Sequence, residues 1–260
     1  MKKIYLVSLI MCSSFFAFSQ TGLHAGVNIG LNSTWILNQN NYGYSEMGYE
    51  LKFGAYPGLA FGYNITPMHG VQIEMNYAML GQNYFDRMRD FSLGDTIGKP
   101  VKVDTYRYVK LNYLHIPVLY RFQTEKAKKD KIEFHIMAGP VIGLLLSADQ
   151  YYESDIADNG TLVKLEYEYA PESLIHDFDS TPEVEEPLEY FTKLDIGLQL
   201  DAGVDIYITD NIYVTPAIKV YYGFADVNTE PTRNILNYTA SHNSFAGIHI
   251  GIHYLVVQKK

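Results

Sequence analysis

Apolar and polar residues alternate strictly along several long segments of the chain. In TGLHAGVNIGLN (residues 21–32), aliphatic side chains occupy nearly every odd position, and His, Gly and Asn occupy the even ones. KLDIGLQLDAGVDI (193–206) and AGIHIGIHY (246–254) repeat the pattern. A period of two indicates β-strands whose two faces meet different surroundings. The pattern therefore predicts an all-β protein.

Eight segments carry this alternation: 21–33, 50–64, 70–85, 103–122, 131–148, 190–208, 211–225 and 243–257. Their connections alternate between short turns (65–70, 124–130 and 209–210) and long loops (34–49, 86–102, 149–189 and 226–242). An even number of strands, with short turns at one end and long loops at the other, is typical of bacterial outer-membrane barrels. We predict an eight-stranded antiparallel up-and-down transmembrane β-barrel, with short periplasmic turns and long extracellular loops.

The composition of the two faces distinguishes this barrel from an exported soluble one such as a lipocalin, which has an apolar interior and a charged outer face. Here the apolar face is an aliphatic band of five to seven positions per strand. That length suits the ~25 Å lipid-facing band of tilted strands. The opposite face, rich in Gly, Asn, Gln and His, suits a narrow lumen. Outer-membrane lipid is therefore an expected partner.

The N-terminus has the features of a secretory signal peptide. A basic start at Lys2 and Lys3 precedes an apolar run from 4 to 16 and the small-x-small site at 17–19. We expect Sec-type export and cleavage near Ser19/Gln20, which leaves a single barrel domain at 20–260 and directs it to the cell outer membrane. Cys12 is the only cysteine and lies in the signal, so the mature chain has no disulfide or thiolate ligand.

Charge is unevenly distributed. The formal net charge is −9, and removal of Lys2 and Lys3 makes it −11. This balance argues against a nucleic-acid partner. Residues 149–189 hold thirteen Asp or Glu against Lys164 alone. Carboxylates can bind calcium, but the D-x-[DN]-x-[DN]-G spacing is absent, so a solvated loop is favoured over a cation site, which stays open as an alternative.

The predicted lumen face carries both signs of charge. Its expected polar network contains His24, Asn28, Glu74, Asp195, Asp201, Asp205, Lys219, His249 and His253, and the same face includes Lys52, Gln82, His115, Arg121, Glu133, His135 and Lys193. Buried charges must pair or be hydrated. A salt-bridged interior that fills the barrel is favoured over a small polar binding site or a proton path. Pro117 and Pro140 are candidate bulge sites that would change which side chains face inward.

His249 and His253 raise the question of a metal site, because two histidines four residues apart on a helix can bind zinc. On a strand the same spacing separates them by about 13 Å, at ~3.3 Å per residue. One zinc ion needs ligand atoms ~2.0–2.1 Å away, so the pair cannot chelate it together. Closure of the barrel would bring His24 toward one of them. These three histidines are weak metal candidates, a hydrogen-bonded plug is favoured, and no cofactor is predicted.

Five segments, in order, resemble the PorT-like outer-membrane β-barrel proteins of Bacteroidetes-type bacteria. They are YLHIPVLYRF (113–122), AGPVIGLLLS (138–147), LDIGLQLDAGVD (194–205), the seventh strand with its end YGF (222–224), and NSFAGIHIGIHY (243–254). The resemblance implies the same barrel fold and outer-membrane location. That family usually carries Glu where this chain has His115. Its founding member is tied to a protein-secretion and gliding machinery, which the resemblance offers as one alternative role.

Catalysis has little support in the sequence. Neither G-x-S-x-G nor H-E-x-x-H occurs, no catalytic residue is predicted, and His242 with Ser244 is the only local hint. The predicted function is an integral, non-enzymatic envelope protein with a structural role or a binding role. The long loops 34–49, 86–102, 149–189 and 226–242 would contact another envelope protein. An outer-membrane lipid-modifying enzyme is the second alternative.

Overall fold

The computed structural model describes residues 22–38, 48–90, 101–124, 131–158, 161–167, 190–229, 233 and 238–257. The proposed signal peptide and its cleavage site lie outside these residues. The described strands are β1 (Gly22–Leu37), β2 (Gly48–Glu50), β3 (Lys52–Ala55), β4 (Gly58–Asn64), β5 (His69–Asp90), β6 (Val101–Gln123), β7 (Ile132–Asp158), β8 (Thr161–Tyr167), β9 (Leu194–Tyr207), β10 (Ile212–Gly223) and β11 (His242–Val257). In this part of the chain, no helix is long and apolar enough to span a bilayer.

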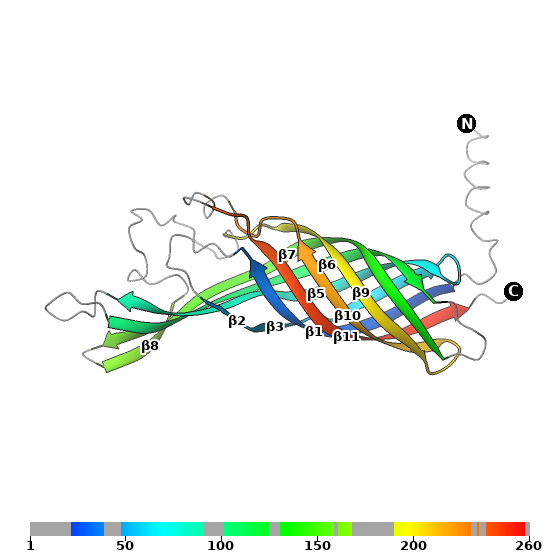
Figure 1. Ribbon diagram of the computed structural model, residues 1–260, viewed down its shortest axis with the longest axis horizontal. Coiled ribbons are helices and arrows are strands. Elements are labelled where there is room, and N and C mark those ends of the chain that lie inside the picture. The colour runs from blue at the N-terminus through cyan, green and yellow to red at the C-terminus, as the bar shows by residue number, and fades with distance from the viewer. Residues whose placement is uncertain are drawn as a thin grey trace, which may run out of the picture.

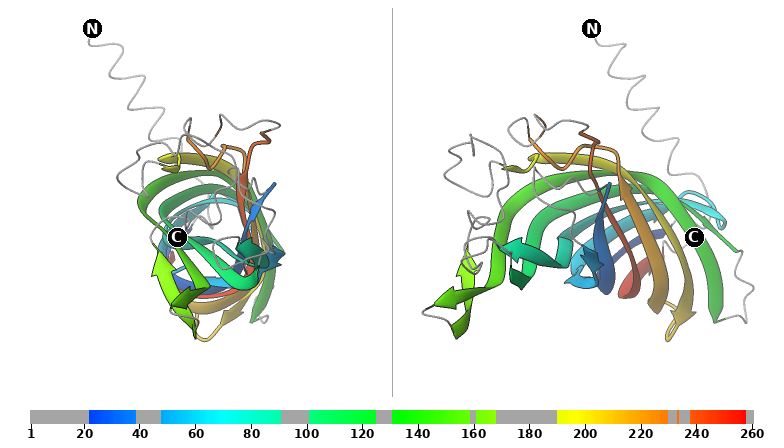
Figure 2. Two further views of the ribbon diagram at one scale, coloured as in Figure 1. Left: turned by 90° about the vertical axis from the view of Figure 1, so that its left-hand side faces the viewer. Right: turned by 60° about the vertical axis from the view of Figure 1, so that its left-hand side comes forward.

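The strands form one antiparallel sheet that closes on itself. The sheet runs β11-β10-β9-β7-β6-β5-β4-β1, and β1 pairs with β11 from Gly22↔Val257 to Leu37↔His242. Seen along its long axis, the molecule is a ring (Figure 2, left). β3 and β4 share one of the eight positions in this ring. The prediction of an eight-stranded up-and-down barrel is confirmed.

The outer face of the barrel is apolar, as expected for contact with lipid. Leu23, Val27, Ile29 and Leu31 of β1 are each more than half exposed, and so are Ile248, Ile250 and Ile252 of β11. A closed barrel pairs the backbone groups of its strands with one another, which is what a lipid environment requires. The aliphatic band and the closed ladder together satisfy the demands of a bilayer.

Three strands run far beyond the barrel at the end opposite the short turns (Figure 1). There the outer parts of β5, β6 and β7 form an open sheet with β2 on one side and β8 on the other. We call this part, residues 48–50, 83–90, 101–110, 149–158 and 161–167, the extension sheet. The prediction that 86–102 and 149–189 are loops is therefore wrong for part of each segment. Hydrogen-bonded strands occupy 86–90, 101–102, 149–158 and 161–167.

The expected continuous strand 50–64 is broken at Tyr56–Pro57. Proline has no backbone N–H to donate to a ladder. The Tyr56 N–H instead donates to the Gly30 carbonyl (3.0 Å), and the Pro57 carbonyl accepts from the Tyr77 N–H (2.9 Å). The Tyr56 side chain is fully buried in the lumen. The break thus keeps the backbone paired while it places a large ring inside the barrel.

A β-bulge in β7 changes which side chains face inward. Asn112 pairs with Ser147 but Tyr113 pairs with Leu145, so β7 has one extra residue there. Gly143, before the bulge in the chain, and Ala148, after it, are both buried. The residues of β7 that face inward therefore have odd numbers before the bulge and even numbers after it. The register is continuous at Pro117 and Pro140, and the suggestion that these prolines mark bulges is wrong.

If the apolar face contacts lipid, the destabilisation caused by a charged substitution on that face should depend on its depth in the membrane. Ile250→Arg, near the middle of the apolar band of β11, should lower the free energy of unfolding by about 2–4 kcal/mol. Val256→Arg, on the same face near the periplasmic end, should cost only about 0–1 kcal/mol. Urea unfolding in lipid vesicles measures both values. Equal costs at the two positions would contradict the assignment.

Candidate functional site

The five histidines inside the barrel share one arrangement. Each of them lies directly across from a glycine on a neighbouring strand. The pairs are His24↔Gly62, His115↔Gly143, His135↔Gly203, His249↔Gly30 and His253↔Gly26.

The glycines make room for the rings. A Cβ atom added at Gly26, Gly30 or Gly62 would overlap the imidazole of the facing histidine, and one at Gly203 would lie 2.8 Å from His135. An aromatic ring that covers a cross-strand glycine restores the packing that the missing side chain forgoes. The alternation of His and Gly along the lumen face is therefore a packing pattern of a narrow barrel.

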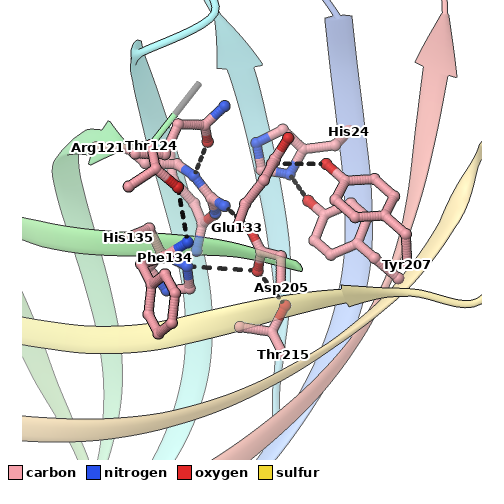
Figure 3. A network of polar contacts seen from close by, with 12 residues as sticks. His24, Arg121, Thr124, Glu133, Phe134, His135, Asp205, Tyr207 and Thr215 are labelled. Carbon is pink, nitrogen blue, oxygen red and sulfur yellow. Dashed lines mark hydrogen bonds and ion pairs between the residues drawn. The ribbon is translucent and has the colours of Figure 1, made fainter. Parts of the chain in front are cut away.

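A charged layer lies at the periplasmic end of the lumen (Figure 3). Arg121 forms an ion pair with Asp205, and both side chains are almost fully buried. Asp205 Oδ1 accepts a hydrogen bond from the Thr215 hydroxyl (2.7 Å) and lies 3.3 Å from His135 Nδ1. Arg121 also donates through Nε to Gln123 (2.6 Å). Each buried charge in this layer thus has an opposite charge and further polar partners.

Aromatic rings pack beside this layer. The Tyr213 hydroxyl lies 3.1 Å from His24 Nδ1, and its ring stacks on His253 with centroids 4.9 Å apart. The His24 and His253 rings meet edge to face at 5.9 Å, so closure of the barrel does bring His24 to a histidine of the last strand. Tyr207 donates to Glu133 (2.9 Å).

The three candidate metal ligands have other partners. His249 Nε2 lies 2.8 Å from Asn32 Oδ1, and His24 Nδ1 faces the Tyr213 hydroxyl. Among the residues that the structure describes, no three His, Cys, Asp or Glu side chains are grouped to hold an ion. His24 and His249 thus have polar partners at one ring nitrogen, and His253 packs against the rings of His24 and Tyr213.

A second charged layer lies at mid-barrel. Lys219 Nζ lies 2.6 Å from Glu74 Oε2 and 3.3 Å from Asp201 Oδ2, so two carboxylates share one ammonium group. Gln72 (2.6 Å) and Asn76 (3.0 Å) donate amide hydrogens to Glu74. These donors supply the hydrogen bonds that a buried carboxylate loses on leaving water.

A small cavity separates the two layers. Its lining includes Asn28, Glu74, Arg121, Lys219, His249 and His253, and the space open to the centre of a water molecule is about 20 Å³. A polar cavity of that size holds about one water molecule. Asn28 is thus placed with the predicted network, at a hydration site too small for a larger solute.

The outer half of the lumen differs from the expected polar interior. Aromatic rings of Tyr56, His115, Tyr221 and Phe245 pack with centroids 4.8–5.9 Å apart. Beyond them lie buried aliphatic side chains from β1, β5, β6 and β7, namely Ile36, Leu80, Val109, Leu111 and Val141. We call this cluster the aromatic plug. The expected salt-bridged interior therefore does not fill the whole barrel, because this apolar cluster occupies much of the outer half.

Two residues at the start of β9 were predicted to face the lumen. Asp195 does so, because it is buried and accepts a hydrogen bond from Asn243 (3.0 Å). Lys193 is exposed and is not part of the interior. The aromatic plug had a sequence signal, because Val109, Leu111 and Tyr113 alternate with partly polar positions on segment 103–122. A bulge at Pro117 would have reversed the inward face of that segment, so the alternation alone did not assign these side chains to the lumen.

The rim pair His242 and Ser244 lies on β11. His242 Nδ1 is 3.1 Å from the Ala225 carbonyl oxygen, and Ser244 is buried. The acidic segment 149–189 is described only at 149–158 and 161–167, and the remainder lies outside the described residues.

The comparison with family models decides what kind of barrel this is. Residues 18–228 match the model of the outer membrane protein beta-barrel domain. The chain belongs to this family. The apolar outer band therefore faces the lipid of the cell outer membrane, and the chain is an outer-membrane β-barrel protein.

Solved structures of several outer-membrane proteins match the chain at low identity. OprG from Pseudomonas aeruginosa is 10% identical, with a TM-score of 0.40, over 92% of this chain and 97% of OprG. Neisserial surface protein A is 10% identical, with a TM-score of 0.38, over 88% and 96%. Ail of Yersinia pestis is 8% identical, with a TM-score of 0.30, over 91% and 99%. No curated protein matches the sequence.

The histidine–glycine pairs predict a specific energetic coupling. Gly30→Ala should destabilise the barrel by about 1–3 kcal/mol, because the new methyl group overlaps the His249 ring. His249→Ala in the same chain should remove most of that cost, with a coupling of about 0.5–3 kcal/mol in a double-mutant cycle. Combining Gly30→Ala with His253→Ala is the matched control and should be additive, because His253 faces Gly26. An additive His249 cycle would refute the pairing.

The mid-barrel layer predicts a cost of removing its cation. Lys219→Met leaves Glu74 and Asp201 buried without a counter-charge, and should cost about 3–5 kcal/mol of unfolding free energy. Adding Glu74→Gln and Asp201→Asn should recover most of that loss. Lys52→Met, at a half-buried lysine near the outer rim, is the control and should have a small effect. Failure of the neutral pair to rescue the barrel would contradict the assignment.

Proposed function

We propose that the barrel is an anchor that does not conduct, and that the protein acts by binding a component of the cell surface through its extension sheet. The observation that carries this proposal is the length of three neighbouring strands. β5, β6 and β7 have 22, 23 and 27 residues, whereas β9 and β10 have 14 and 12. A transmembrane strand needs only about 9–11 residues. The additional residues of β5–β7 therefore have no role within the membrane.

The filled lumen supports the anchor part of the proposal. Two charged layers and the aromatic plug occupy the interior one above the other, and the small cavity between the layers is the size of a water molecule. An eight-stranded barrel is just wide enough for its interior side chains to fill it. The charges of the two layers are paired with one another, Arg121 with Asp205 and Lys219 with Glu74 and Asp201.

The alternative functions rest on the sequence. A secretion or gliding role derives from the PorT-like resemblance, and membership of that group is itself a prediction. His115, where that group carries Glu, packs here against Tyr56 and Tyr221 in the aromatic plug. A lipid-modifying enzyme would need a serine, a histidine and an acid together at the rim, and His242 is bonded elsewhere. A partner protein contacted through the extension sheet is compatible with the proposal.

Shortening one hairpin tests the proposal. The β7–β8 hairpin pairs Glu153 with Glu166, so replacement of residues 154–165 by Asn-Gly leaves a two-residue turn between them. We expect this variant to keep the heat-modifiable migration of a folded barrel. We also expect it to lose cell-surface components that the full-length protein retains in pull-downs from native outer membrane, identified by mass spectrometry.

Two results would overturn the proposal. One is a steady ion conductance of the full-length protein in planar bilayers, because an anchor with a filled lumen should have none. The other is identical sets of retained components for the full-length and shortened proteins. The Ile250→Val variant, which changes only the lipid face, serves as the control for handling and detergent.

A further inference from the structure

Part of the barrel wall is not closed by a backbone ladder. Among the described strands, β3 is hydrogen-bonded in a ladder to β1 alone, whereas β4 on its periplasmic side and β2 on its outer side pair with β5. β3 nevertheless lies against β5, because a Cβ atom added at Gly54 would overlap the Met79 carbonyl oxygen. We call this contact, between residues 51–56 and residues 78–82, the wall seam.

Side chains take the place of the ladder at the wall seam. The Thr34 hydroxyl donates to the Gly81 carbonyl (3.0 Å), and the Gln82 amide donates to the Glu50 carbonyl (2.6 Å). Gly81 has a φ of 117°, a backbone conformation that favours glycine, so β5 departs from regular strand geometry at the same point. Local opening costs least where few backbone hydrogen bonds must break. The wall seam should therefore separate more easily than the wall below it, where β4 and β5 form a ladder.

The wall seam lies at the outer boundary of the hydrocarbon layer. Gly81 pairs in register with Lys110 of β6, and Lys110 pairs with Asp149 of β7; both charged residues are exposed. A charge within the hydrocarbon is costly, so the apolar layer ends below this level. In Figure 1, β3 lies where the closed ring gives way to the extension sheet. Backbone groups freed here would meet water, so opening does not carry the penalty of an unpaired group in lipid.

Lys52 of β3 opposes closure of the wall seam. Burial, and then the neighbouring Lys110 ammonium group, lower the pKa of Lys52 from 10.5 to about 8. Both causes disfavour the charged form, so the closed seam is most stable when the amine is neutral. That stability declines as the pH falls from about 10.5 to about 8, and at neutral pH the decline is complete. Opening hydrates the ammonium group and relieves this cost.

The apolar end of the aromatic plug lies on the strands around the wall seam. Ile36 of β1 and Leu80 of β5 are buried in this cluster, and so is Tyr56, which directly follows β3. These side chains make the outer lumen impassable from either end of the barrel. Separation of β3 from β5 would reach them from the side, while the two charged layers below stay in place.

We propose that the wall seam is a lateral gate at the outer rim. β3 and β5 separate there while the remaining wall stays closed, and hydration of the Lys52 ammonium group favours the open state. Opening exposes an apolar surface at the outer boundary of the membrane that the closed barrel hides. The gate belongs to the barrel wall and does not depend on the proposed binding role of the extension sheet.

Thiol labelling of the full-length protein in detergent micelles tests the gate. Cys12 is the only cysteine and lies in the proposed signal peptide, so a single introduced cysteine is the only thiol of the mature chain. Leu80→Cys places the thiol behind the wall seam. Leu119→Cys is the matched control, because Leu119 is also a fully buried leucine but lies where β6 is laddered to β5. A water-soluble maleimide should react with Leu80→Cys at least about tenfold faster than with Leu119→Cys.

Second substitutions should move the rate at Leu80→Cys in opposite directions. Thr34→Val removes a hydrogen bond of the wall seam and should speed labelling by about two- to tenfold. Lys52→Met removes the buried charge and should slow labelling by about fivefold, less than the full pKa shift would give because Lys52 is partly exposed. Lys52→Arg keeps the charge and should label like the parent. Labelling of Leu119→Cys should stay the same throughout.

Three results would overturn the gate: equal labelling of the two cysteines, equal acceleration of both by Thr34→Val, or a rate at Leu80→Cys that neither second substitution changes. Heat-modifiable migration checks that each variant is folded. Hydrogen exchange measured by NMR gives a second readout without cysteines. The Met79 and Gly81 amides should exchange faster than the Tyr77 amide, which donates to the Pro57 carbonyl (2.9 Å), and Lys52→Met should slow them. Exchange as slow as that of Tyr77 would also refute the gate.

Discussion

The pairing of β1 with β11 is the constraint on which the rest of the molecule depends. It removes both edges of the sheet over sixteen paired positions, from Gly22↔Val257 to Leu37↔His242. In lipid an unpaired backbone group costs several kcal/mol, so an open sheet with this apolar face could not stay in a membrane. Closure also defines an interior, and that interior is narrow because only eight strands surround it.

A narrow interior explains the chemistry of the lumen. The imidazole rings of the lumen lie across from glycines, as His249 does from Gly30 and His253 from Gly26. The charges of the two layers form compact groups, Lys219 with Glu74 and Asp201, and Arg121 with Asp205. The same space restriction allows the aromatic plug to seal the outer half. The packing of the rings and the pairing of the charges are thus consequences of the small circumference of the closed barrel.

The extension sheet has a different physical basis. Beyond the membrane the ring is no longer complete, so β5, β6 and β7 continue as an open sheet that keeps its hydrogen bonds but exposes its outward side chains. The bulge near Leu145 sets which β7 residues point outward there, and so brings Tyr151 beside Tyr108. The anchoring part and the proposed binding part therefore share the same strands and are rigidly connected.

The sequence by itself determined the all-β class, the eight-stranded ring and the lipid-facing side. In an exported chain, strands that alternate between aliphatic and polar residues can form few other folds. It also placed His24, Glu74, Asp201, Asp205, Lys219, His249 and His253 in the lumen. Only the tertiary structure decided the histidine–glycine pairs, the ion-pair partners, the bulge in β7 and the extension sheet. These features depend on register between strands far apart in the chain, and alternation along a single strand carries no information about register.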